Sequence, residues 1–130
     1  MINGKELMIG DYVNFNTNGT EVVLGIVKEI RDEGEQLTVS VNGDKVFDTC
    51  ADEDICSIKL SEEFFLKNGF KELCRTEYSI RLYNSDLYLR VKITPENHFT
   101  CNHIDINYVH EFQHYLRLVN LSDYANNLKI

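Results

Sequence analysis

Residues 21–47 read EVVLGIVKEIRDEGEQLTVSVNGDKVF, and apolar residues alternate with polar ones through most of this stretch. A period of two is typical of β-strands that bury one face. Two turn signals, Asp32-Glu33-Gly34 and Asn42-Gly43-Asp44, separate three such strands. The stretch therefore predicts an antiparallel sheet, with Gly25 as a bend or bulge inside the first strand.

Strands are expected on both sides of this stretch. Residues 12–16 follow the Gly10-Asp11 turn and lead into another turn at residues 17–20, and residues 55–60 supply one more strand. Five short strands with turns every ~8–12 residues favour a small SH3-like antiparallel β-barrel. Its core is predicted from the apolar positions of the alternation, which are Val13, Val23, Ile26, Val39, Val41, Phe47 and Ile58.

A short helix is predicted after the barrel. Ser61 is suited to cap its N-terminus, acidic residues fill its first turn, and Asn68-Gly69 is a C-terminal stop signal. Its two phenylalanines, Phe64 and Phe65, are expected to close one end of the barrel.

A hairpin and a second helix are predicted in the remainder of the chain. Residues 78–93 alternate on either side of Asn84-Ser85-Asp86, and residues 98–101 are a candidate third strand. The helix expected over residues 106–121 is amphipathic. It should pack against the hairpin, because a two-stranded hairpin is marginally stable alone.

The composition is that of one globular domain. The chain has 130 residues, of which 43% are hydrophobic and 26% charged, so it can bury a sizeable core. We therefore expect a single α+β domain over residues 1–130, with a barrel-like sub-region 1–60 and a helix, hairpin and helix in 61–130. Residues 1–7 do not resemble a signal peptide, and no apolar run approaches a membrane span, so a cytoplasmic protein is expected.

The charge balance restricts the partners. A formal net charge of −8 argues against nonspecific binding to nucleic acid or to an anionic membrane, because both reward clustered Lys and Arg. A protein partner is compatible with this charge, and the oligomeric state is left open. The four cysteines lack CxxC spacing and are expected to be reduced thiols.

The segment His110-Glu111-Phe112-Gln113-His114 has the HExxH pattern of zinc metalloproteases. On a helix the two histidines lie one turn apart and could bind zinc, with Glu111 as the general base. A third ligand would be His103 or Cys101, because the residues after His114 contain neither His nor Cys. One functional hypothesis is therefore a minimal zinc-dependent metallohydrolase.

The pattern of apolar residues along this helix argues against a zinc site. The apolar stripe that should face the core contains Tyr108, Val109, Phe112, Tyr115, Leu116 and Val119. His110, His114 and Arg117 fall on the opposite side, where a helix normally faces solvent, and a guanidinium is a poor neighbour for zinc. We therefore interpret the histidines as solvated or locally hydrogen-bonded, with no catalytic residue and no cofactor.

A metal without catalysis is a further possibility. All four histidines and Cys101 lie between residues 98 and 114, so two of them could complete a structural zinc site. The spacing His98-x2-Cys101-x-His103 does not match a zinc-finger pattern, although Cys101 and His103 would share one face of a strand.

Three stretches carry a resemblance: ELMIGDYV at residues 6–13, IKLSEEFFLKNGF at 58–70 and INYVHEFQH at 106–114. In this order they resemble a family of short uncharacterised proteins of Bacteroidetes and their phages or mobile elements. In that family the positions matching Glu111 and His114 are often other residues, which implies that catalytic zinc is absent. Tyr12 and Phe112 stand where the family has Trp and Leu. The family has no assigned activity, so the resemblance leaves function open. The hypothesis we favour is a nonenzymatic accessory or protein-interaction module of a bacterial mobile element or phage, with the minimal zinc hydrolase as the alternative.

Overall fold

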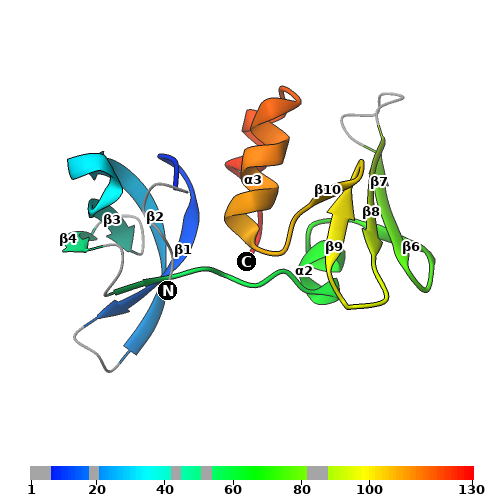
Figure 1. The fold of residues 1–130 in the computed structure, drawn as a ribbon, viewed down its shortest axis with the longest axis horizontal. Helices are drawn as coiled ribbons and strands as arrows, with labels where there is room; N and C mark the ends of the chain where they lie inside the picture. The colour runs from blue at the N-terminus through cyan, green and yellow to red at the C-terminus, as the bar shows by residue number, and fades with distance from the viewer. Residues whose placement is uncertain (1–6, 18–20, 42–44, 51–53, 82–87) are drawn as a thin grey trace. The chain divides into compact units, whose positions relative to one another are not determined.

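The computed structural model describes residues 7–17, 21–41, 45–50, 54–81 and 88–130. The chain divides into two compact units: unit 1 holds residues 1–58 and 108–126, and unit 2 holds residues 59–107 and 127–130. Each unit contains an antiparallel sheet of five described strands, and helices accompany both sheets (Figure 1). The predicted α+β class is therefore confirmed. The predicted turns at residues 18–20, 42–44 and 84–86 lie outside the described residues.

Unit 1 is built on a sheet with the strand order β4-β3-β2-β1-β5. The connection between β2 and β3 is a single 3-10 turn, η2, in which Glu33 has φ 56. Two helices follow from the C-terminal part of the chain. The elements are β1 Tyr12–Thr17, β2 Glu21–Arg31, η2 Asp32–Gly34, β3 Gln36–Val41, β4 Lys45–Cys50, β5 Ile55–Cys56, α3 Val109–Leu118 and α4 Ser122–Ala125.

The sheet of unit 1 is strongly curled but open. Phe15 on β1 and Phe47 on β4 have ring centroids 5.4 Å apart, although two strands separate them in the sheet. In a flat sheet, three strand spacings would hold them roughly 14 Å apart. β4 and β5 are the two edges and do not pair with each other among the described residues. The SH3-like barrel is therefore not formed, because the sheet curls without closing.

The core of unit 1 lies inside this curl. It contains Leu7, Val13, Phe15, Val27, Leu37, Val39, Val41 and Ile55. Burial is thus confirmed for three predicted core residues, Val13, Val39 and Val41. Val23 is partly buried and packs against this core, as predicted. Ile26 and Ile58 are half-buried outside the core cluster, and Phe47, on the edge strand β4, is 36% exposed, so the prediction was wrong for these three.

Gly25 explains why Ile26 was misplaced. The prediction put a bend or bulge at Gly25, which would turn the following residue toward the core. Instead the pairing is regular at Gly25, and the register shifts between Val27 and Glu29. Gly25 serves packing: a Cβ built on it would lie 2.4 Å from Cγ1 of Val39, far inside van der Waals contact. The alternation therefore carries Val27 inward and leaves Ile26 on the outer face.

Replacing Gly25 with alanine should therefore destabilise the protein. Val39 is fully buried and β-branched, so its side chain cannot rotate away cheaply. We expect a loss of about 1–3 kcal/mol in the free energy of unfolding, the usual range for overpacking. Urea denaturation of Gly25→Ala measures it. The same change made in a Val39→Ala background should cost less, and an equal cost in both backgrounds would exclude this contact as the cause.

Unit 2 is built on a sheet with the strand order β10-β9-β8-β7-β6. Neighbouring strands are antiparallel throughout, and a register shift interrupts the β6–β7 pairing between Glu72 and Cys74. The elements are α2 Glu62–Lys67, β6 Lys71–Cys74, β7 Glu77–Arg81, β8 Tyr88–Ile93, β9 Phe99–Cys101 and β10 Ile104–Asp105. The predicted third strand at residues 98–101 is thus confirmed as β9.

The helix α2 begins and ends as predicted. The backbone N–H of Phe64 donates to Oγ of Ser61, and Gly69 follows the helix with φ +88. Phe65 packs its ring against Phe70 and Phe99, with centroids 5.1 Å and 5.3 Å away. Phe64 and Phe65 belong to the aromatic core of unit 2, and their predicted packing on the end of the barrel-like region would join the two units and stays a prediction.

The C-terminal helix α3 belongs to unit 1, whereas the hairpin β7–β8 belongs to unit 2. Within unit 1, α3 contacts β1 and α4. Its predicted packing on the hairpin would join the two units and stays a prediction. Among the described residues, no helix is long and apolar enough to cross a membrane.

Candidate functional site

The HExxH segment lies on α3, and its glutamate has a local structural role. Glu111 Oε1 accepts a hydrogen bond of 3.2 Å from the backbone N–H of Tyr108, the N-cap residue. The carboxylate also lies in the first turn, where the helix dipole favours negative charge. Glu111 therefore stabilises the start of the helix. In the zinc-hydrolase hypothesis the same residue would be the general base.

The second histidine of the motif pairs with a buried carboxylate. Asp11, just before β1, has no exposed surface and accepts three hydrogen bonds. Nε2 of His114 lies 2.6 Å from Oδ2, Nη1 of Arg117 donates to Oδ1 at 2.6 Å, and the backbone N–H of Met8 donates to Oδ2 at 2.8 Å. A buried charge is tolerated only when it is paired and hydrogen-bonded, and these three donors meet that requirement.

Gln113, between the histidines, ties the same two chain segments together. Its side chain has no exposed surface. Oε1 accepts from the backbone N–H of Tyr12 at 2.8 Å, and Nε2 donates to the carbonyls of Gly10 and Ala125 at 3.1 Å and 3.2 Å. We call Asp11, Gln113, His114 and Arg117 the polar junction, because together they fasten α3 to the start of β1 and to the end of α4.

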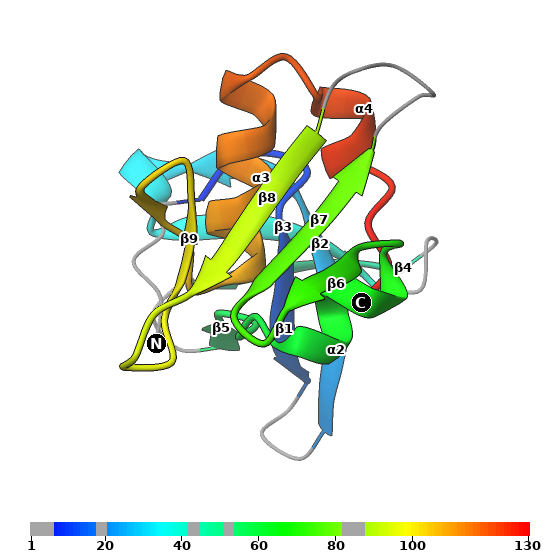
Figure 2. The same ribbon diagram turned by 90° about the vertical axis from the view of Figure 1, so that its right-hand side faces the viewer.

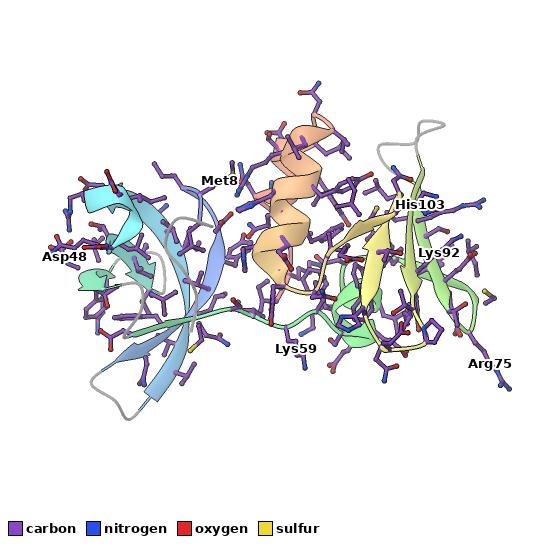
Figure 3. The ribbon with its side chains drawn as sticks, viewed as in Figure 1. Met8, Asp48, Lys59, Arg75, Lys92 and His103 are labelled. Carbon is purple, nitrogen blue, oxygen red and sulfur yellow. The ribbon has the colours of Figure 1, made fainter. Side chains whose placement is uncertain are left out.

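The backbone around the polar junction is adapted to it. Gly10 has φ +94, and a Cβ there would lie 3.1 Å from Nη2 of Arg117, so glycine serves both the conformation and the close approach. The hydroxyl of Tyr12 donates to the carbonyl of Asn126 at 2.9 Å. Burial raises the pKa of Tyr12 above its usual value of 10.0, and the nearby Arg117 partly opposes this shift. Met8 lies beside α3, where its sulfur contacts Arg117 (Figure 3).

The prediction that the histidine side of α3 faces solvent was wrong. His110 is only 3% exposed, and its ring stacks on Tyr108 with centroids 5.8 Å apart. The side chains of His114 and Arg117 are 24% and 17% exposed. Tyr108 and Val119, which were assigned to the core stripe, flank the helix as its caps and are exposed. The physical reason is Asp11. Its buried carboxylate needs hydrogen-bond donors, and polar residues of α3 supply them.

The upstream candidates belong to unit 2, whereas the motif belongs to unit 1. His98 Nδ1 lies 3.2 Å from Oδ1 of Asn107. Cys101 is buried at the end of β9 and pairs with Ile104 across a two-residue turn. His103 is in that turn, at the end of the β9–β10 hairpin (Figure 3), so Cys101 and His103 do not share the face of one strand.

A metal site is not assembled in the described part of the chain. No group of three or more His, Cys, Asp or Glu side chains there is close enough to hold a metal ion. A carboxylate such as Asp11 could orient a zinc-bound histidine. Here, however, Arg117 shares that carboxylate with His114. The described residues therefore do not form a metal-binding group from the proposed ligands His110, His114, His103 and Cys101. The absence of zinc stays a prediction.

The turn residue His103 offers a test of its role. Asn102 and His103 have φ 52 and φ 67, as the two central residues of a type I′ hairpin turn require. This conformation is unfavourable for a histidine and natural for glycine. His103→Gly should therefore raise the free energy of unfolding by up to about 1 kcal/mol. Thr100→Gly in β9 should lower it instead. Stabilisation of the wild type by added zinc that His103→Gly abolishes would instead indicate a metal ligand.

A depression on the surface of unit 1 has a volume of about 230 Å³. Arg31, Gln36, Asp48 and Thr49 line it. Arg31 donates to Asp48 at 3.1 Å, and Thr38 donates to the same carboxylate at 2.8 Å. The Thr38 hydrogen bond, followed by Arg31, lowers the pKa of Asp48. Its charged groups satisfy each other, so this depression does not present an uncompensated charge to a ligand.

No family model matches the chain, and neither a curated protein nor a solved structure is detectably similar to it. The polar junction was missed in the sequence because Asp11 and His114 are 103 residues apart. One signal was present: Gln113 is a polar residue directly beside the apolar stripe of α3. A buried glutamine needs backbone partners, which indicates that another segment crosses the helix at that position.

Proposed function

We propose that the chain is a nonenzymatic protein-interaction module, of the kind that an accessory protein of a bacterial mobile element or phage would supply. The nonenzymatic part is supported by the polar junction. Glu111 caps α3 and His114 pairs with Asp11, so the two residues that a zinc hydrolase would need are already used in folding. The resemblance of the three sequence stretches suggests the origin.

The observation that carries the interaction is an exposed apolar face on the sheet of unit 1. Val46 on β4 pairs with Ser40 on β3, which pairs with Ile26 on β2, so these side chains share the outer face, on which Ser40 is buried and Ile26 half-buried. Val22 and Leu24 continue that face along β2. Val46 is 61% exposed, Val22 63% and Leu24 41%. Exposed apolar residues that gather on one face are typical of interaction sites, whereas scattered ones need no explanation.

The surroundings of this face suggest the chemistry of the partner. Asp48 follows Val46 on the same side of β4, and its side chain is 73% exposed. Unit 1 as a whole carries fourteen acidic and five basic residues. An apolar patch with an acidic surrounding favours a partner that presents apolar side chains beside Lys or Arg.

Site-specific photo-crosslinking tests this proposal. A benzophenone amino acid at position 46 should give a discrete adduct with one heterologous protein in host cells, whereas the same group at Glu35, which is exposed on polar surface, should not. Leu24→Lys should abolish the adduct formed from position 46 without lowering the melting temperature. Equal labelling from both positions, or an adduct that survives Leu24→Lys, would contradict the assignment of this face.

The alternative of a zinc hydrolase has a separate test. Protein purified without chelator should contain far less than one zinc per chain, and Glu111→Gln should not change peptide or ester hydrolysis. Elemental analysis that gives about one zinc per chain would replace the proposal by the metal-site hypothesis.

A further inference from the structure

The strand β4 differs from the other strands at the sheet edges. In the described part of the chain the edge strands are β4, β5, β6 and β10. β5 and β10 have two residues each, and β6, which lies beside α2 (Figure 2), is interrupted by its register shift. β4 has six residues and pairs with β3 at every one of them. Short or bulged edges resist the addition of another strand, whereas a long regular edge accepts one.

The free side of β4 is open to pairing. Alternate residues of an edge strand direct their N–H and C=O groups away from the sheet. No described residue outside the sheet forms a backbone hydrogen bond with β4, and the hydrogen bonds of its side chains join other side chains. Lys45, Val46, Phe47 and Asp48 are exposed, and Thr49 is half-buried. An extended segment can therefore pair with β4 and continue the sheet.

The side chains of β4 define positions along such a segment. They alternate between the two faces of the sheet. Val46 and Asp48 are on the outer face, and Phe47 is on the opposite face, where its ring lies 5.4 Å from that of Phe15. A strand added to β4 places one residue beside Val46 and another, two positions away, beside Asp48. An apolar residue suits the first position, because Val46 is 61% exposed.

Asp48 offers a hydrogen-bond acceptor at the second position. Its side chain is 73% exposed (Figure 3). The hydrogen bonds from Thr38 and Arg31 both end on Oδ1, and no described residue donates to Oδ2. The depression of about 230 Å³ adjoins β4, because Asp48 and Thr49 line it together with Arg31 and Gln36. It can admit the end of a long side chain that donates to Oδ2.

The charges at this end of β4 favour a cation as that donor. Arg31 and Asp48 compensate each other, but Glu29 pairs with the same guanidinium at 3.7 Å and Asp54 is hydrogen-bonded to β4, so the surroundings are acidic. Lys45 is at the opposite end of the strand. Unit 1 has a formal charge of −9, whereas unit 2 has +1 from eight basic and seven acidic residues. A second copy of unit 1 is therefore repelled, and a segment that carries Lys or Arg is attracted.

We propose that β4 binds an extended segment of another protein, which adds to the sheet as a further antiparallel strand. The segment carries an apolar residue beside Val46 and a Lys or Arg beside Asp48. This inference rests on the protein-interaction function proposed above and names how the partner binds. Backbone hydrogen bonds along β4 supply the affinity, and the two side-chain positions select the sequence.

A labelled peptide of sequence TTKVVTT, acetylated and amidated at its ends, tests the proposal by fluorescence anisotropy with the full chain. Two derivatives carry two N-methyl groups each, one on the third and fifth residues and the other on the fourth and sixth. N-methylation removes amide donors without changing the side chains. Only one of these alternate sets faces β4, so one derivative should bind at least about tenfold more weakly than the other.

A variant of the protein tests the cation position. Asp48→Asn should weaken binding of the unmethylated peptide by about three- to tenfold, because a charge-assisted hydrogen bond is lost. Asp123→Asn, the same change at an exposed residue of α4 in unit 1, should leave binding unchanged. Both variants should keep the wild-type melting temperature.

The outcomes separate this inference from the function on which it rests. No binding at about 1 mM peptide, equal losses with the two methylated peptides, or equal binding by the two variants would overturn strand addition. If a discrete adduct still formed from position 46, the partner would contact the outer face without pairing with β4, and the proposed function would stand. Loss of both the peptide binding and the adduct would overturn both proposals.

Discussion

Replacing Asp11 with alanine is expected to lower the free energy of unfolding by about 3–5 kcal/mol. The carboxylate is fully buried, and its removal leaves His114, Arg117 and the backbone N–H of Met8 without their acceptor. Removing one partner of a buried ion pair costs far more than the pair itself contributes, because the remaining charge is left desolvated. Chemical denaturation followed by circular dichroism measures this loss, which would be a large share of the ~5–15 kcal/mol typical of a domain.

A matched control for this variant is available on the same sheet. Asp48 also accepts hydrogen bonds from an arginine and a threonine, but its side chain is 73% exposed. Water replaces those partners when Asp48 is removed, so Asp48→Ala should shift the denaturation midpoint little. Equal shifts in Asp11→Ala and Asp48→Ala would mean that the buried carboxylate does not organise the polar junction.

The second large effect is expected for Phe112→Ala, at about 3–5 kcal/mol. The ring lies between the two histidines of the motif in sequence and has no exposed surface. Its removal would leave a cavity that the surrounding side chains fill only partly. Leu118→Ala on the same helix is the control, because that side chain is 82% exposed and should change stability by less than about 0.5 kcal/mol. A similar loss in both variants would contradict the orientation assigned to α3.

Local sequence patterns predicted many of the secondary-structure elements. The alternation over residues 21–47 predicted β2, β3 and β4, and the cap at Ser61 with the stop at Asn68-Gly69 predicted α2. These features depend on neighbours within a few residues, which the sequence displays directly. The face of β2 was harder to predict, because Gly25 can mark either a bulge or a close contact, and only the position of Val39 decides between them.

The orientation of α3 could not be obtained from its own periodicity. The apolar stripe correctly placed Val109, Phe112, Tyr115 and Leu116 in the interior. The pairing of His114 depends on a residue far away in the chain, Asp11. A helical pattern reports hydrophobic burial but does not reveal where a distant carboxylate requires donors. The net charge of the whole chain also hides local differences, because it is the sum of an acidic unit 1 and a weakly basic unit 2.

Two of the three stretches that carry the resemblance meet at the polar junction. Residues 6–13 contain Gly10, Asp11 and Tyr12, and residues 106–114 contain Gln113 and His114. These residues contact each other through three hydrogen bonds or ion pairs of 2.6–3.1 Å. A further hydrogen bond joins Tyr12 to Asn126, beyond the second of these stretches.

The central claim is that His114 serves the fold by pairing with Asp11, and a double-mutant cycle tests it most directly. Asp11→Asn keeps the side-chain shape and removes the charge, and His114→Gln removes the imidazole ring but keeps a polar side chain. The free energies of unfolding of the two single variants and the double variant should give a coupling energy of about 1–3 kcal/mol. Additive effects, within about 0.3 kcal/mol, would show that the two side chains do not stabilise each other and would contradict the account.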